Sequence, residues 1–204
     1  MAKRTAIIDI GSNSARMAIF ERSSRFGFHL IMETKSRVRI GEGAYNFGGL
    51  LQDVALERAF KALEEFKNII QSLHCHKVLC VATSALRDAP NAPLFIKKVK
   101  DALGIHIKVI DGTKEAYYGA VGAINYPKKL DDALTIDIGG GSTELARIQN
   151  GTIIDTISLN IGTVRLKELF FDKKIPLNET RAFIENELQK IPEHFLSDTL
   201  IGIG

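Results

Sequence analysis

Apolar and polar residues follow two different periods along this chain, and the two periods predict both strands and helices. Short apolar runs bounded by glycines or polar residues are typical of buried strands. The stretch from Asp53 to Leu73 instead has apolar residues at helical spacing with Lys and Glu between them, which predicts a long amphipathic helix. The predicted buried strands are Thr5–Ile10, Lys77–Ala82, His106–Ile110, Leu134–Asp137 and Thr199–Ile203.

Further helices are predicted from apolar residues at helical spacing and from residues that are typical of helix ends. A helix with Phe95 and Val99 on its buried face is expected to be capped by Asn91 or Asp88. The remaining helical segments are Lys114–Ile124, Arg165–Phe170 and Asn178–Lys190. The segment 37–49 contains four glycines and is expected to be a mobile surface loop.

The two halves of the chain share a repeated pattern. Ile8–Ser14 (IDIGSNS) aligns with Ile136–Ser142 (IDIGGGS), and each copy follows an apolar run. After each copy come two more strand-like segments, which are Arg16–Glu21 and Gly27–Lys35 in the first half and Glu144–Gln149 and Thr152–Asn160 in the second. A repeated unit of this length predicts two domains of like fold, whose glycine loops are expected to face each other across one cleft.

The repeated loops have the composition of a phosphate-binding site. Glycines allow backbone N–H groups to approach a ligand closely, and N–H groups that converge on one point suit a phosphate. Asp137, at the end of its strand, is placed to hold a hydrated Mg²⁺ that faces the phosphate. The alternative is a hairpin turn that is merely rich in glycine.

The predicted domains are residues 1–125 and 126–204, with Asn125–Asp132 as the linker candidate. In the first half the strand Lys77–Ala82 is followed by further helices and a strand, whereas its counterpart Thr199–Ile203 is followed only by Gly204. The second domain is therefore expected to be incomplete. An unpaired strand edge invites association, so a homodimer is an open possibility.

Two further residues are candidates for chemistry. Glu115 is predicted in the first turn of a helix of small residues, where it is either a carboxylate favoured by the helix dipole or a general base for a water. Arg87 follows the strand Lys77–Ala82, at the strand end where α/β sheets bind ligands. The alternative for Arg87 is a solvated surface residue.

Composition narrows the class of protein. The chain has 204 residues, of which 45% are hydrophobic and 25% charged, and its net charge is +3. No apolar run approaches the roughly 18 residues of a membrane span, and no basic run with interleaved aromatics indicates duplex nucleic acid. A cytoplasmic protein without a membrane partner is therefore expected. The cluster of His74, Cys75, His76 and Cys80 lacks the spacing of a zinc site.

Taken together, the sequence resembles the exopolyphosphatase/guanosine pentaphosphate phosphohydrolase (Ppx/GppA) family. Five segments in order carry the resemblance, namely Asp9–Ser14, Ala82–Asn91, Gly112–Ala116, Asp137–Glu144 and Ser158–Arg165. The family belongs to the actin, sugar-kinase and heat-shock-chaperone ATPase superfamily. The resemblance therefore implies an α/β fold of two ribonuclease-H-like domains.

The resemblance also implies an activity and roles for residues. The activity is Mg²⁺-dependent removal of the terminal phosphate from polyphosphate or from guanosine pentaphosphate, which would leave guanosine tetraphosphate. Glu115 would be the catalytic base and Arg87 would hold the scissile phosphate, while Asp137, with Glu144 and Asp9, would form the metal site. The phosphate-binding residues would be Gly11, Ser12, Asn13, Ser14, Gly139, Gly140, Gly141 and Ser142.

Two other functions are compatible with the same fold. One is an ATP-dependent kinase of the superfamily, although Glu115 stands where such a kinase would carry an acceptor-activating aspartate. The other is a catalytically inactive module that binds a nucleotide or phosphate.

Overall fold

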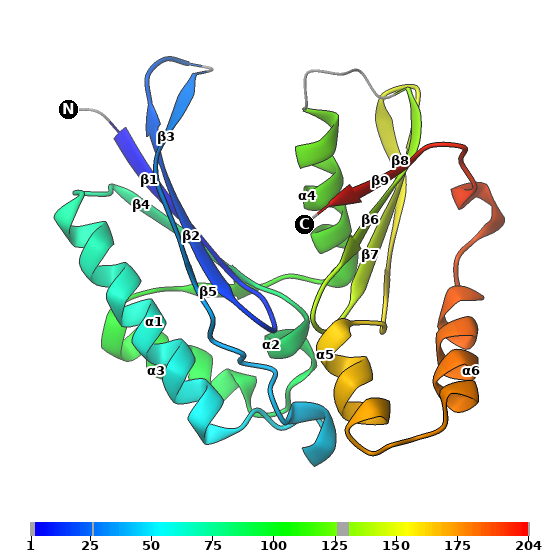
Figure 1. Cartoon of the computed structure of the whole chain (residues 1–204). Helices are drawn as coiled ribbons and strands as arrows, with labels where there is room; N and C mark the ends of the chain where they lie inside the picture. The colour runs from blue at the N-terminus through cyan, green and yellow to red at the C-terminus, as the bar shows by residue number, and fades with distance from the viewer. Residues whose placement is uncertain (1–2, 26, 126–130, 204) are drawn as a thin grey trace. The chain divides into compact units, whose positions relative to one another are not determined.

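A computed structural model describes residues 3–25, 27–125 and 131–203, which form two compact units (Figure 1). The first unit is Met1–Val109 and the second is Ile110–Gly204. The division thus falls before helix α4 (Gly112–Ile124), whereas the sequence predicted a boundary between residues 125 and 126. The reason is that α4 packs on the sheet of the second unit. Most of the predicted linker lies outside the described residues.

The first unit is built on a five-stranded sheet of order β3-β2-β1-β4-β5. β1 pairs antiparallel with β2 and parallel with β4, so a hairpin and a crossover meet at the central strand. The strands are β1 (Lys3–Ile10), β2 (Ala15–Arg22), β3 (Phe28–Ser36), β4 (Lys77–Ala82) and β5 (Ile107–Val109).

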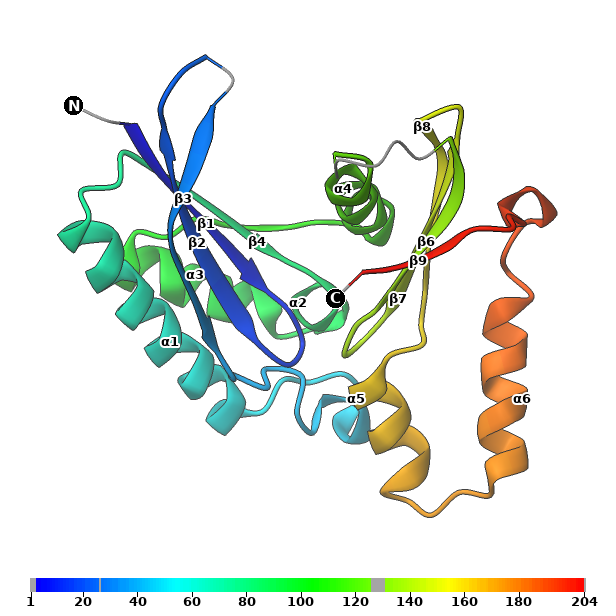
Figure 2. The same ribbon diagram turned by 45° about the horizontal axis from the view of Figure 1, so that its top comes forward.

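Helices α1 (Asp53–Ser72) and α3 (Ala92–Leu103) cover one face of this sheet (Figures 1 and 2). Their apolar stripes bury Leu63 and Val99 completely against the alternate residues of β1 and β2 that point to the same face. Asn91 precedes α3 but does not cap it through its side chain, which instead bonds the backbone of Leu51.

The expectation of a mobile surface loop at residues 37–49 is wrong. Val38 and Ile40 are fully buried in the core of the first unit, and Ala44–Phe47 forms a short 3₁₀-helix. The glycines of this segment indicated flexibility, but Gly43, Gly48 and Gly49 adopt positive φ in fixed turns.

The second unit is built on a four-stranded sheet of order β8-β7-β6-β9. β6 pairs antiparallel with β7 and parallel with β9, the same arrangement that β1 has with β2 and β4. The strands are β6 (Asp132–Ile138), β7 (Thr143–Gln149), β8 (Thr152–Leu159) and β9 (Leu200–Ile203).

The two faces of the second sheet are covered differently. Helix α4 packs on one face, where small side chains on both partners, including Ala116, Ala120 and Ala146, allow a close approach (Figure 1). On the other face Leu145 and Leu159 form a small core with Phe195. The chain between β8 and β9 forms α5 (Thr163–Leu166), a π-helix (Lys167–Phe171), α6 (Leu177–Leu188) and a 3₁₀-helix (Glu193–Phe195).

The two sheets confirm the predicted fold class. In both units three antiparallel strands in chain order are followed by a helix and by a strand that pairs parallel with the first strand. This is the duplicated ribonuclease-H-like topology of an α/β protein. No helix in the described ranges has the length and apolar character needed to cross a lipid bilayer.

Candidate functional site

The two predicted phosphate loops are the hairpin connections of matched strands, and they close in the same way. The Gly11 N–H donates to the Ser14 carbonyl at 3.0 Å, and the Gly139 N–H donates to the Ser142 carbonyl at 2.9 Å. A Cβ atom on Gly11 or Gly139 would lie 3.4 or 3.2 Å from the same carbonyl oxygen. Both loops are therefore hairpin turns, and their role in binding phosphate stays a prediction.

In the first unit, the carbonyl groups of the loop are held by the segment that follows β3. Gly41 N–H donates to the Ser12 carbonyl at 3.0 Å, and Arg39 N–H donates to the Asn13 carbonyl at 2.8 Å. The Ser12 hydroxyl is buried and lies 2.9 Å from the buried Ser84 hydroxyl at the start of α2 (Ser84–Asp88).

In the second unit, the equivalent segment after β8 holds the second loop. Thr163 N–H donates to the Gly139 carbonyl at 3.0 Å, and the N–H groups of Val164 and Arg165 donate to the Gly140 carbonyl at 2.8 and 3.1 Å. The Arg165 side chain donates from Nε to the Gly141 carbonyl at 2.7 Å. All three glycine carbonyls are thus bonded within the unit.

Four N–H groups of the two loops differ from the bonded carbonyl groups just described. Among the described residues, no backbone or side-chain acceptor receives the N–H groups of Ser12, Asn13, Gly140 or Gly141. Consecutive N–H groups whose carbonyls are turned away form a concavity that favours an anion. Each loop therefore offers two adjacent N–H groups to an anion, and phosphate binding by these groups stays a prediction.

Asp9 and Arg87 both belong to the first unit. Asp9 is in β1, opposite Arg16 of β2 and Val81 of β4, on the face away from α1. Arg87 is not at the end of a strand, as the sequence predicted, but in the last turn of the short helix α2. Its side chain is 21% exposed, and its Nε lies 3.5 Å from the Asp88 carboxylate. Because Ser84 contacts Ser12, α2 begins at the first loop.

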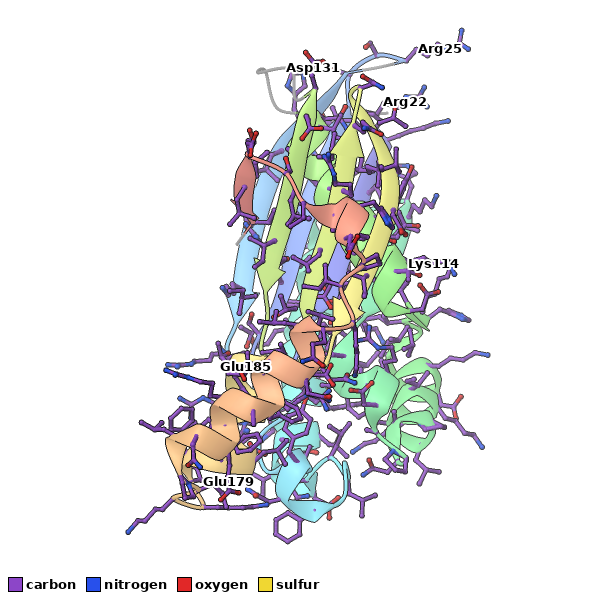
Figure 3. All side chains as sticks on the ribbon, turned by 90° about the vertical axis from the view of Figure 1, so that its right-hand side faces the viewer. Arg22, Arg25, Lys114, Asp131, Glu179 and Glu185 are labelled. Atoms are coloured by element: carbon purple, nitrogen blue, oxygen red, sulfur yellow. The ribbon has the colours of Figure 1, made fainter. Side chains whose placement is uncertain are left out.

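Glu115 lies in the first turn of α4, in the second unit. Asp111 caps this helix by accepting hydrogen bonds from the Lys114 side chain, the Thr113 hydroxyl and the Lys114 N–H, which hold the pKa of Asp111 well below its usual range. Lys114 lies in the first turn of α4 (Figure 3). The helix start is therefore firmly fixed.

The position of Glu115 along the second sheet follows from the packing of α4. A Cβ atom on Gly119 would lie 3.5 Å from the Ile203 side chain, and Ile203 pairs with Asp137. Glu115 precedes Gly119 by one helical turn, on the same face of α4. Since α4 runs antiparallel to β6 (Figure 1), Glu115 lies at the end of the sheet where β6 ends and the second glycine loop begins.

Asp137 and Glu144 are the candidate metal ligands of the second unit. They are directly opposite each other on β6 and β7, and Ser158 of β8 continues the row and donates to the Glu144 carboxylate at 2.7 Å. Burial raises the pKa of Asp137, so a nearby cation would stabilise its ionised form.

The candidate ligand set of the second unit provides two carboxylates, a number that Mg²⁺ sites commonly take from a protein. No cluster of three or more His, Cys, Asp or Glu side chains suited to a metal exists in the ranges that the structure describes. Mg²⁺ commonly uses one or two carboxylates and completes its shell with water and phosphate oxygens. The pair of Asp137 and Glu144 satisfies that requirement, and Asp9 belongs to the other unit.

Some residues that shape the site were not predicted from the sequence. Ser84 and Gly162 are examples, although both belong to segments that carry the family resemblance. A Cβ atom on Gly162 would lie 2.4 Å from the Gly140 carbonyl oxygen, so only glycine fits there. The predicted facing of the two loops across one cleft stays a prediction.

The sequence comparison assigns the chain to a family. The Ppx/GppA phosphatase family matches residues 18–203, and the chain belongs to this family. A bifunctional 3-dehydroquinate synthase/phosphatase of Fusobacterium nucleatum is 41% identical over 174 residues, which cover 81% of this chain and 26% of that protein. A guanosine-5'-triphosphate,3'-diphosphate pyrophosphatase of Photobacterium profundum is 32% identical over 204 residues, covering 97% of this chain and 41% of that protein.

The comparison of structures agrees with the family. An exopolyphosphatase from Cytophaga hutchinsonii has a TM-score of 0.84 and 28% sequence identity, with 98% of this chain and 66% of that chain covered. The chain spans between 26% and 41% of the length of the curated relatives that it matches.

The close approach of Gly162 to the second loop gives a test of the loop support. We expect Gly162→Ala to destabilise the protein by about 3 kcal/mol, because the new methyl group must displace the Gly140 carbonyl. Gly122→Ala is the matched control, since Gly122 is an exposed helical glycine with nothing within 4 Å of its added Cβ, and should stabilise α4 by about 0.5–1 kcal/mol. Urea unfolding measures both, and equal effects would contradict the packing.

The partly buried carboxyl of Asp137 predicts a dependence of stability on pH. Because its pKa is raised in the folded protein, the native state binds more protons and stability falls as pH rises above the usual value of 3.8. At pH 7 without divalent cations, Asp137→Asn should therefore be more stable than the unaltered protein, because the amide carries no charge to desolvate.

The advantage of Asp137→Asn should disappear below pH 3.8, where both forms are neutral. Thermal unfolding as a function of pH measures it. Asp198→Asn serves as the control, because Asp198 is an exposed residue of the same unit and its replacement should change little. A less stable Asp137→Asn at pH 7 would contradict the desolvation argument.

Proposed function

We propose that this protein hydrolyses the terminal phosphoanhydride bond of inorganic polyphosphate or of guanosine pentaphosphate, in a reaction that depends on Mg²⁺. Family membership supports the reaction class. Relatives described as a guanosine-5'-triphosphate,3'-diphosphate pyrophosphatase and as an exopolyphosphatase support the two substrates. Both substrates present the same terminal anhydride, so one chemistry serves both.

The observation that carries the proposal is the direction of the backbone carbonyl and N–H groups in the two glycine loops. In each loop the carbonyl groups bond to the segment that follows the third strand of the same unit, which leaves N–H groups for an anion. A strand-terminal aspartate precedes each loop, Asp9 in the first unit and Asp137 in the second. A polyphosphate chain offers many anionic oxygens to backbone donors of this kind.

The proposed step is an in-line displacement. A water oxygen attacks the terminal phosphorus, the bond from that phosphorus to its bridging oxygen breaks, and the bridging oxygen keeps the electron pair. The products are inorganic phosphate and a chain one phosphate shorter. Glu115 orients the water and accepts its proton, a role that suits a carboxylate fixed on the first turn of a well-capped helix.

The remaining residues balance charge and hold the phosphates. Arg87 holds the scissile phosphate, because a guanidinium can donate two parallel hydrogen bonds to phosphate oxygens. The N–H groups of Gly140 and Gly141 bind phosphate oxygens. Asp137 and Glu144 would hold Mg²⁺, which when bound neutralises charge on the phosphates.

The proposal is tested by phosphate release from polyphosphate and from guanosine pentaphosphate by the whole protein. We expect one phosphate per bond broken, release only while Mg²⁺ is present, and loss of activity on chelation. ATP with a sugar or acetate acceptor serves as the control substrate pair. Transfer to an acceptor rather than to water, or release that persists in a chelator, would refute the proposal.

The assignment of Glu115 predicts a specific variant. Glu115→Gln keeps the size and hydrogen bonding of the side chain but removes its basicity, so kcat should fall about a hundredfold while KM changes little. Glu179→Gln is the matched control, because Glu179 also lies in the first turn of a helix, α6, and is exposed (Figure 3). Normal turnover by Glu115→Gln would remove the base from this mechanism.

A further inference from the structure

Glu187 is a buried carboxylate that the proposed reaction does not use. It lies near the end of α6 and is 6% exposed. Glutamate is rarely buried unless it is paired, so its partners indicate what it holds in place.

The partners of Glu187 connect α6 to the support of the second loop. One carboxylate oxygen accepts the Asn160 N–H at 3.0 Å, and the other pairs with Lys190. Burial raises the pKa of Glu187, but Lys190, the Asn160 N–H and the nearby charge of Arg165 outweigh it, and the net pKa is lowered. Glu187 is therefore an ionised acceptor at neutral pH.

Asn160 begins the short segment that holds the glycine loop. The next residue, Ile161, accepts the Thr143 hydroxyl at 2.6 Å, and Thr143 directly follows the loop. Gly162 packs against Gly140, and Thr163 to Arg165 donate to the loop carbonyls. Every residue from Ile161 to Arg165 thus touches the loop or the residue after it.

We propose that Glu187 is a positioning residue for the second phosphate loop. Its bond to Asn160 fixes where the segment Ile161–Arg165 leaves β8, and that segment sets the direction of the Gly139–Gly141 carbonyls. The N–H groups of Gly140 and Gly141 point to the anion as a consequence. Since this role rests on the proposed function, its test measures anion binding and does not require turnover.

The position of Glu187 on α6 offers a matched control. Glu185 lies on the same helix and is exposed (Figure 3). Because it precedes Glu187 by two residues, it lies on the opposite face of α6. Replacing either residue by Met removes one negative charge and keeps a long side chain on the helix. Only Glu187→Met leaves the Asn160 N–H without its acceptor.

The experiment is calorimetric titration of the protein and its variants with inorganic tripolyphosphate, together with the amide NMR resonances of Gly140 and Gly141. We expect Glu187→Met to bind at least tenfold more weakly and to shift both resonances without ligand. Glu187→Gln, which keeps an acceptor oxygen, should remain within about threefold. Glu185→Met should match the unaltered protein.

The outcomes separate the two proposals. The positioning role alone is overturned if the unaltered protein binds tripolyphosphate and Glu187→Met binds it as tightly as Glu185→Met does. It is also overturned if the unaltered protein binds and Glu187→Met leaves the Gly140 and Gly141 resonances unshifted. No binding by the unaltered protein overturns the phosphate site and the positioning role together. If Glu187→Met does not fold, Glu187→Asp replaces it in the test. Aspartate keeps the negative charge but is one methylene too short to reach the Asn160 N–H. Normal tripolyphosphate binding by Glu187→Asp would overturn the positioning role.

Discussion

The structure depends on how the carbonyl groups of two four-residue hairpin loops are satisfied. A glycine loop that bonded through its N–H groups would close on itself and offer nothing to an anion. Here one N–H in each loop closes the turn, from Gly11 to Ser14 and from Gly139 to Ser142. The other backbone dipoles are oriented by donors from the segment after the third strand. In the first unit this segment is held by Val38 and Ile40, which are buried in the core. In the second unit it is held by the close packing of Gly162 against Gly140.

Much of the fold could be predicted from the sequence because the strands have a strong local signal. Lys77–Ala82 has the predicted bounds, and the repeat of Ile8–Ser14 in Ile136–Ser142 predicted the matched hairpins. Helix α1 was equally clear, because a long amphipathic stripe has no competing interpretation. The two loops themselves were found because glycine next to aspartate at a strand end is a local pattern.

The features that the sequence did not reveal depend on contacts between distant residues. Glu187 bonds to Asn160, and Ser12 lies against Ser84. The residues of each pair are too far apart in the sequence for a periodic pattern to predict their contact. Helix α4 has a composition that suits either sheet, so its place on the second one required the structure. Arg87 was predicted at a strand end because the helix α2 that carries it is too short to show periodicity.

Because each hairpin loop is supported by its own unit, the hydrogen bonds that orient its carbonyl groups all lie within that unit. The supporting segments differ in sequence, since they are Arg39–Gly41 in the first unit and Thr163–Arg165 in the second. Both nevertheless donate backbone N–H groups to the loop carbonyls. What the two units share at this point is a direction of the backbone and not a set of side chains.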